Sequence, residues 1–120
     1  MSCTATIRNA GDVAIVDVSG KITLGEGAGT LRETIASLLA EGRKKILLNL
    51  GDVSYIDSAG LGELVGAFTS VRNRGGSIKL LNVQKKMQDL LQITKLYTVF
   101  ETYDDEQEAL RSFSQQAAQA

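Results

Sequence analysis

The pattern of apolar and polar positions divides the chain into two kinds of segment. Short apolar runs rich in β-branched residues predict strands at residues 4–8, 13–19, 45–50, 78–83 and 99–103. The run at 45–50 is almost continuously apolar, which is typical of a strand buried on both faces. A short connection containing Gly11 separates the first two runs and predicts a β-hairpin.

The segments between the later strands carry apolar residues at helical spacing. A glycine-rich loop at residues 25–29 is predicted to lead into the first helix, which opens with a capping box of Thr30 and Glu33 and ends at Gly42. Further helices are predicted at residues 58–73, at residues 85–92 and from Asp104 onward, and the tail at residues 114–120 is predicted to fray.

The order of these segments predicts an α/β fold. An N-terminal hairpin followed by alternating helices and strands favours a mixed sheet of about four to five strands, with about four helices and right-handed crossovers. The length of 120 residues suits one domain, residues 1–120, and no repeat or linker interrupts it. Nothing in the pattern requires an assembly larger than a monomer.

Composition removes several classes of function. The chain contains no histidine, which excludes Ser-His and Cys-His nucleophile pairs and zinc sites that need imidazole. It contains no tryptophan, few aromatic residues and a net charge of −1, so neither a stacking surface nor a basic surface for nucleic acid is expected. We therefore expect a binding module with no catalytic residues, no cofactor, no metal and no direct contact with nucleic acid.

The expected location is the cytoplasm. Cys3 is the single cysteine and cannot form an internal disulfide, which fits a reducing compartment. No run approaches the ~20 apolar residues of a membrane span, and the N-terminus lacks the charged-then-apolar order of a signal peptide. We expect no contact with a membrane.

Several candidates for chemistry have ordinary structural explanations. The glycines at residues 25–29 match neither the dinucleotide-binding pattern nor the P-loop, so a tight connection is favoured over a phosphate site. The basic stretches at residues 43–45 and 85–86 are expected on exposed faces. No second catalytic group supports an acid–base or magnesium site formed by Asp52, Asp57 and Glu63.

The segment after residues 45–50 is the strongest candidate for a binding surface, because α/β proteins bind ligands and partners at the carboxyl ends of their parallel strands. Asp57 can cap the helix at 58–73 and place Ser58 in its first turn, near free backbone N–H groups. Interior glycines at 60, 62 and 66 each cost about 1 kcal/mol of helix propensity. Close packing of helix on sheet and a flat surface for another protein explain them equally well.

The stretches at residues 48–50 and 52–56 lead into a motif formed by Asp57, Ser58, Ala59, Gly60, Leu61 and Gly62. This arrangement resembles the signature of STAS domains, and more narrowly that of the single-domain anti-sigma factor antagonists of bacteria. The resemblance covers nearly the whole chain, from the first hairpin to the final helix. It implies the STAS fold, with the element order predicted above.

The resemblance also implies a mechanism of partner switching. The unphosphorylated domain is expected to bind an anti-sigma factor, a serine kinase with the histidine-kinase-like ATPase fold, and so to free a sigma factor. Phosphorylation of the motif serine would break this complex, and a PP2C-type phosphatase would restore it. By position, Ser58 is the implied phosphoacceptor, and Asp57 with residues 59–62 is the implied contact surface.

Two positions depart from the family pattern. Ala59 stands where antagonists often have Ser or Thr, and Thr23 stands where they often carry Asp at the partner interface. These departures concern the identity of the partner more than the fold. Two other functions remain open: a STAS scaffold or cytosolic subunit of a lipid-transport ABC system, which needs no phosphorylated serine, and a small nucleotide-binding protein that uses residues 25–29.

Overall fold

Five strands form one mixed sheet in the computed structural model, which describes the backbone of residues 3–118 and the side chains of residues 3–114. The strands are β1 (Cys3–Ala10), β2 (Val13–Ile22), β3 (Lys45–Ile56), β4 (Ser77–Leu81) and β5 (Thr102–Tyr103). They lie in the sheet in sequence order; β1 runs antiparallel to β2, and each later pair is parallel. The predicted hairpin and mixed sheet are confirmed.

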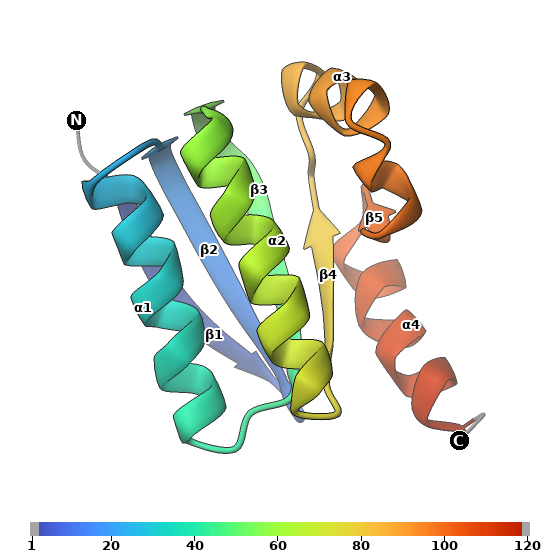
Figure 1. Cartoon of the computed structure of the whole chain (residues 1–120). Helices are drawn as coiled ribbons and strands as arrows, with labels where there is room; N and C mark the ends of the chain where they lie inside the picture. The colour runs from blue at the N-terminus through green and yellow to red at the C-terminus, as the bar shows by residue number, and fades with distance from the viewer. Residues whose placement is uncertain (1–2, 119–120) are drawn as a thin grey trace.

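Helices cover both faces of this sheet (Figure 1). They are α1 (Glu26–Ala40), α2 (Ser58–Asn73), α3 (Lys85–Ile93) and α4 (Glu106–Ala118). The helices α1 and α2 lie side by side on one face, α4 packs against β3, β4 and β5, and α3 lies beyond the end of β4. Because α1, α2 and α3 each follow a parallel strand, their N-termini gather at one edge of the sheet, which we call the carboxyl edge.

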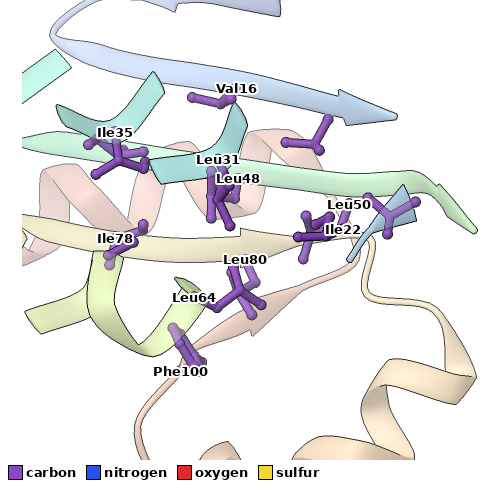
Figure 2. Packing of buried hydrophobic residues seen from close by; sticks show 14 of the residues in the cluster. Val16, Ile22, Leu31, Ile35, Leu48, Leu50, Leu64, Ile78, Leu80 and Phe100 are labelled. Atoms are coloured by element: carbon purple, nitrogen blue, oxygen red, sulfur yellow. The ribbon is translucent and has the colours of Figure 1, made fainter. Parts of the chain in front are cut away.

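Two hydrophobic clusters hold the layers together. The larger lies between the sheet and the helices α1 and α2, and Figure 2 shows members of this cluster from both layers, among them Val16 and Leu48 of neighbouring strands and Leu64 of α2. Leu47 points to the opposite face and packs in the second cluster with Phe113 of α4. Burying one such side chain contributes about 1.5–3 kcal/mol. The predicted burial of β3 on both faces is confirmed.

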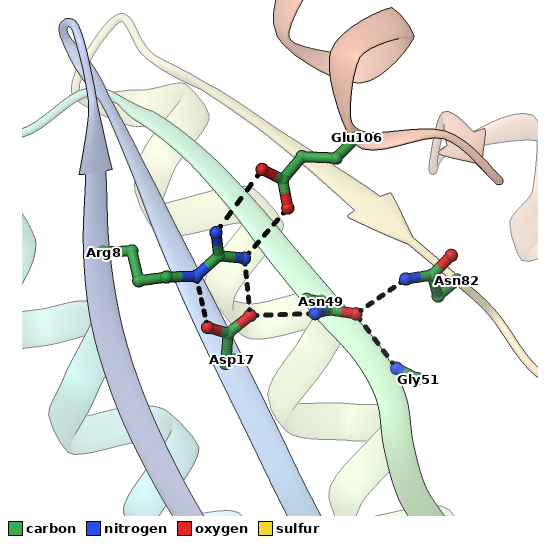
Figure 3. Close-up of polar contacts among 6 residues, drawn as sticks. All are labelled: Arg8, Asp17, Asn49, Gly51, Asn82 and Glu106. Atoms are coloured by element: carbon green, nitrogen blue, oxygen red, sulfur yellow. Dashed lines mark hydrogen bonds and ion pairs between the residues drawn. The ribbon is translucent and has the colours of Figure 1, made fainter.

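An ionic network joins α4 to the first two strands (Figure 3). Arg8 Nη2 lies 3.0 Å from Asp17 Oδ1 and 2.9 Å from Glu106 Oε1. Asn49 Nδ2 donates a further hydrogen bond of 2.8 Å to Asp17. The hydrogen bonds from Arg8 and Asn49 hold the pKa of Asp17 below its ordinary value. Because these side chains are partly exposed, we expect the network to orient α4 more than to stabilise the fold.

The strand β3 is longer than the sequence predicted. The prediction ended it at Leu50, but its pairing with β2 continues to Ile56, and β2 itself continues beyond residue 19 to Ile22. The pairing of β3 with β2 shifts register at two places, and at the first of them, a bulge, Leu50 and Gly51 lie opposite a single residue of β2. The side chain of Asn49 accepts the hydrogen bond of the Gly51 N–H at 3.1 Å, which satisfies the group that the bulge removes from the ladder.

The helix α1 begins earlier than predicted. It starts at Glu26, so Thr30 lies inside the helix and the predicted capping box does not form. The residue before the helix is Gly25, whose φ of 94° favours glycine. Gly27 is buried against β2, where a Cβ would overlap the carbonyl oxygen of Lys21. Residues 26–29 are therefore the first turn of a helix and not the predicted loop.

The last strand and the last helix, by contrast, begin later than predicted. The strand β5 covers Thr102–Tyr103, and a 3₁₀ turn, Leu96–Thr98, precedes it. The helix α4 begins at Glu106, because the side chain of Asp105 accepts a hydrogen bond from the Glu108 N–H at 3.0 Å and so caps the helix. Of the tail predicted to fray, residues 119–120 lie outside the described residues.

Candidate functional site

Asp57 joins the start of α2 to the loop that precedes α1. As the N-cap residue of α2, it accepts a hydrogen bond from the Gly60 N–H at Oδ1, at 2.9 Å. Its Oδ2 accepts a second from the Leu24 N–H at 3.0 Å. The hydrogen bond from Gly60 has the largest effect on the pKa of Asp57 and that from Leu24 the next largest, and both lower it. The predicted cap is confirmed, and both carboxylate oxygens are engaged in holding the local structure.

Ser58 is the first residue of α2, and its side chain is exposed. Backbone N–H groups at the start of a helix lack partners within the helix, and the helix dipole adds partial positive charge there. The position therefore favours a negatively charged group on the Ser58 hydroxyl. Another protein can reach this hydroxyl without any rearrangement of the fold.

The three glycines of α2 fall into two groups. Gly60 is buried, and a Cβ at this position would overlap the carbonyl oxygen of Ile22 at the end of β2. Gly62 and Gly66 are exposed, and no neighbouring element lies within 4 Å of the place that a Cβ would take. Close packing thus explains Gly60 alone. The other two glycines leave the outer surface of α2 bare.

The other candidate residues also lie at the carboxyl edge. Thr23 is half-buried, and its carbonyl oxygen accepts the Ala28 N–H at 2.9 Å. It directly precedes Leu24, so the hydrogen bond from Leu24 to Asp57 brings the loop at 23–25 to the start of α2. The structure therefore places Thr23 close to the motif, as a shared surface requires.

The motif itself is only partly exposed. Ala59 and Leu61 are half-buried, and Leu61 packs against the larger core cluster. Among residues 57–62, the exposed ones are Ser58 and Gly62. The surface that another protein can touch is therefore narrower than the motif.

Two large apolar side chains next to the motif are exposed and were not among the predicted site residues. Leu24 is 79% exposed and Tyr55 is 54% exposed. Leu24 is held beside Asp57 by its backbone hydrogen bond, and Tyr55 lies two residues before Asp57 at the end of β3. The sequence does mark both residues, because each is a large apolar residue outside every predicted strand and helix.

The three carboxylates considered for acid–base or metal chemistry do not gather. Glu63 forms an ion pair with Arg32 of α1 at 3.0 Å. Asp52 lines a polar hollow with Asn49 on the other face of the sheet. Among the residues that the structure describes, no group of acidic or cysteine side chains is placed to hold a metal ion. Nor does any described helix have the length and apolar character needed to cross a membrane.

The sequence model of the STAS domain family matches residues 4–109 of this chain, from β1 into α4. The chain belongs to the STAS domain family. This membership confirms the resemblance predicted from the motif at residues 57–62 and from the order of the elements.

Several named relatives of this chain are antagonists of anti-sigma factors. The anti-sigma-B factor antagonist of Bacillus subtilis is 37% identical over 94 residues, which cover 78% of this chain and 84% of that protein. The chain covers 64% of the length of a related Thermotoga neapolitana protein. The crystal structure of a proposed anti-sigma factor antagonist from Thermotoga maritima has a TM-score of 0.85 at 28% identity, covering 92% of this chain and 94% of that one.

A more distant neighbour has been solved in two states. Unphosphorylated SpoIIAA, an anti-sigma factor antagonist, has a TM-score of 0.69 at 19% identity and covers 91% of this chain and 96% of that one. The phosphorylated form of Bacillus SpoIIAA has a TM-score of 0.72 at 20% identity and covers 91% of this chain and 98% of that one. At this identity the likeness shows the fold alone.

Proposed function

We propose that this STAS domain is an anti-sigma factor antagonist, and that phosphorylation of Ser58 switches off its binding to the anti-sigma factor. The observation that carries the proposal is the exposed Ser58 hydroxyl on the first turn of α2, beside the bare surface at Gly62. The relatives named as antagonists support the same function.

The proposed partner is an anti-sigma factor that is also a serine kinase. In the transfer, the Ser58 Oγ forms a bond to the γ-phosphorus of ATP, the bond from that phosphorus to the bridging oxygen breaks, and ADP leaves. The backbone hydrogen bonds to Asp57 lower the pKa of its carboxylate and make it a weak base, so we assign the base that takes the Ser58 proton to the kinase. This chain acts as the substrate and binding module, not as the enzyme.

Phosphorylation should leave the free domain folded. The phosphate adds about −1.5 to −2 charges and three strong acceptor oxygens. The first-turn N–H groups and the dipole of α2 favour such an anion, while water screens its repulsion from the neighbouring Asp57.

The complex should respond differently, because a docked partner excludes the water that screens the phosphate. Burying an unpaired charge costs several kcal/mol. A cost of about 3 kcal/mol would already weaken binding more than about a hundredfold. A PP2C-type phosphatase would restore binding by removing the phosphate. Contact with nucleic acid or with a membrane plays no part in this mechanism, and the chain acts as a monomer.

The first experiment locates the phosphate. The purified chain is incubated with ATP and each anti-sigma factor kinase of the source organism, and the modified residue is identified by mass spectrometry. We expect phosphate on Ser58 and none on Ser54, an exposed serine of β3 that serves as the internal control. The Ser58→Ala chain should bind the kinase without being modified. Modification elsewhere, or none with any of the kinases, would contradict the proposed switch.

A pull-down with Ser58→Ala separates this function from that of a transporter subunit. The variant cannot be phosphorylated at position 58, so it should retain an anti-sigma factor during purification. Recovery of an ABC ATPase in its place would overturn the proposal and favour a subunit of a transport system.

A further inference from the structure

An apolar pocket opens at the carboxyl edge between the end of β3 and α3. It has a volume of about 160 Å³, and its apolar lining consists of Leu50, Val53, Tyr55, Ile56, Met87 and Leu90. Gln84, the N-cap residue of α3, donates a hydrogen bond to the Gly51 carbonyl in the bulge of β3. The pocket therefore lies between two regular elements that are tied to each other.

The pocket is continuous with the surface around Ser58. Tyr55 and Ile56 line it and directly precede Asp57 and Ser58 in the chain. A typical protein interface buries about 800 Å² on each partner. A protein that covers Ser58 with an interface of this size can extend over Tyr55 to the mouth of the pocket.

The volume of the pocket indicates what it can hold. Sites for small ligands usually measure about 300–1,000 Å³. This pocket, at about 160 Å³, has room for one large side chain. The exposed ring of Tyr55 adds an aromatic wall, and tyrosine is enriched among the residues that dominate binding energy at interfaces.

A positively charged side chain, that of Lys86, also lines the pocket. Lys85 and Lys86 are in the first turn of α3, where the helix dipole disfavours positive charge. Asp89, one turn further along, compensates Lys85 with an ion pair of 3.4 Å. Lys86 lines the pocket and forms no ion pair with any residue in the described part of the chain. A carboxylate on the occupant would complement this charge.

We propose that the pocket between β3 and α3 receives a large apolar side chain of the anti-sigma factor, with a carboxylate beside it that pairs with Lys86. This inference rests on the proposed function and adds a second contact to it. Ser58 determines whether the partner binds, and the pocket contributes to which partner binds. The two contacts lie on neighbouring segments of one surface, so they can be altered separately.

The test uses the full chain and the purified kinase that binds it. We expect Tyr55→Ala to raise the Kd about tenfold or more, since it removes an aromatic wall of the pocket. Lys86→Glu should raise the Kd about fivefold and slow association, because it replaces attraction by repulsion. The matched controls are Tyr97→Ala, whose tyrosine is 52% exposed but does not line the pocket, and Lys44→Glu at the opposite end of β3. Both controls should stay within about twofold of wild type.

A second readout reports on the pocket directly. The chain has two methionines, and Met87 lines the pocket, so its methyl resonance in a ¹³C-methyl-methionine sample should shift when the kinase is added. The inference would be overturned if the kinase binds wild type but not Ser58→Asp, while the Met87 resonance does not shift and Tyr55→Ala binds with the Kd of wild type. That result would leave the proposed function intact.

Two further outcomes would also overturn the inference. A Met87 shift that depends on the concentration of the chain alone would assign the pocket to a second copy of this chain. Failure of wild type to bind any kinase would remove the proposed function and this inference together.

Discussion

The first turns of α2 have a glycine on the inner face, toward the sheet, and another on the outer face, and the two have different surroundings. On the inner face, Gly60 lies against the carbonyl oxygen of Ile22 and leaves no room for a Cβ. On the outer face, Gly62 is exposed, with no neighbouring element within 4 Å of a Cβ. The inner glycine is needed for the helix to approach the sheet, whereas the outer one costs about 1 kcal/mol of helix propensity without any contact in return.

This difference separates the motif at residues 57–62 into two sets. Asp57 and Gly60 hold α2 to β2 and to the loop before α1. Ser58 and Gly62 face outward and contribute little to packing. Changes in the first set should therefore destabilise the fold, and changes in the second should alter binding without destabilising it.

The largest expected loss of stability comes from Gly60→Ala. The added methyl would overlap the Ile22 carbonyl, and this backbone atom cannot move without disturbing β2. Overpacking of this kind should lower the free energy of unfolding by about 3 kcal/mol. Urea denaturation followed by circular dichroism measures the loss. A Gly60→Ala chain as stable as wild type would contradict the close approach of α2 to β2.

A smaller loss is expected for Asp57→Ala. This change removes the cap of α2 and the acceptor for the Leu24 N–H, so the Tm should fall by a few degrees. Asp52→Ala is the matched control, since Asp52 is exposed and does not cap a helix. Differential scanning calorimetry on both variants makes the comparison, and equal melting temperatures would refute the role of Asp57 as a connector.

Gly62→Ala should act in the opposite direction on the free chain. The alanine meets no neighbour, so the gain in helix propensity should stabilise the fold by about 0.5–1 kcal/mol. The same methyl should weaken partner binding severalfold, because it projects from the bare surface next to Ser58. Gly66→Ala, one turn further from Ser58, should bring the same gain in stability with a smaller effect on binding. Unchanged affinity in Gly62→Ala would show that the bare surface is not a contact.

The smallest expected effect is a difference in acid stability. Since the pKa of Asp57 is lowered in the folded chain, its contribution is complete above the unfolded value of about 3.9 and is lost as the pH falls through the lower, folded value. Asn at position 57 can still cap the helix but does not titrate. Below about pH 4, the Tm of wild type should therefore fall more steeply than that of Asp57→Asn. The pKa of Asp17 is also lowered, first by Arg8, so this pair also loses its stabilising effect as the pH falls, but it does so equally in wild type and in Asp57→Asn. Parallel curves would argue against the lowered pKa of Asp57.

The order of elements could be predicted from the sequence because it follows from local periodicity. The boundaries that failed depend on contacts between distant residues. The extension of β3 to Ile56 needs the Asn49 side chain to compensate the bulge at Gly51, and no local pattern shows this. The early start of α1 depends on the packing of Gly27 against Lys21 of β2.

The part of the candidate site that depends on neighbouring residues could be predicted, and the part that depends on distant residues could not. The cap at Asp57 and the place of Ser58 follow from neighbouring residues, so the motif was sufficient. The bond from the Leu24 N–H to Asp57 joins segments 33 residues apart. The pocket beside Tyr55 requires β3 and α3 to meet. These features became visible only when the fold placed the segments together.

The central claim is that Ser58 controls binding to the partner without controlling the fold. It is tested most directly by measuring the Tm and the Kd for the anti-sigma factor kinase on matched preparations of wild type, Ser58→Ala and Ser58→Asp. The account predicts melting temperatures within about 2 °C of one another. It also predicts wild-type affinity for Ser58→Ala, and a Kd more than about a hundredfold higher for Ser58→Asp. A Ser58→Asp chain that binds the kinase as tightly as wild type at an unchanged Tm would contradict it.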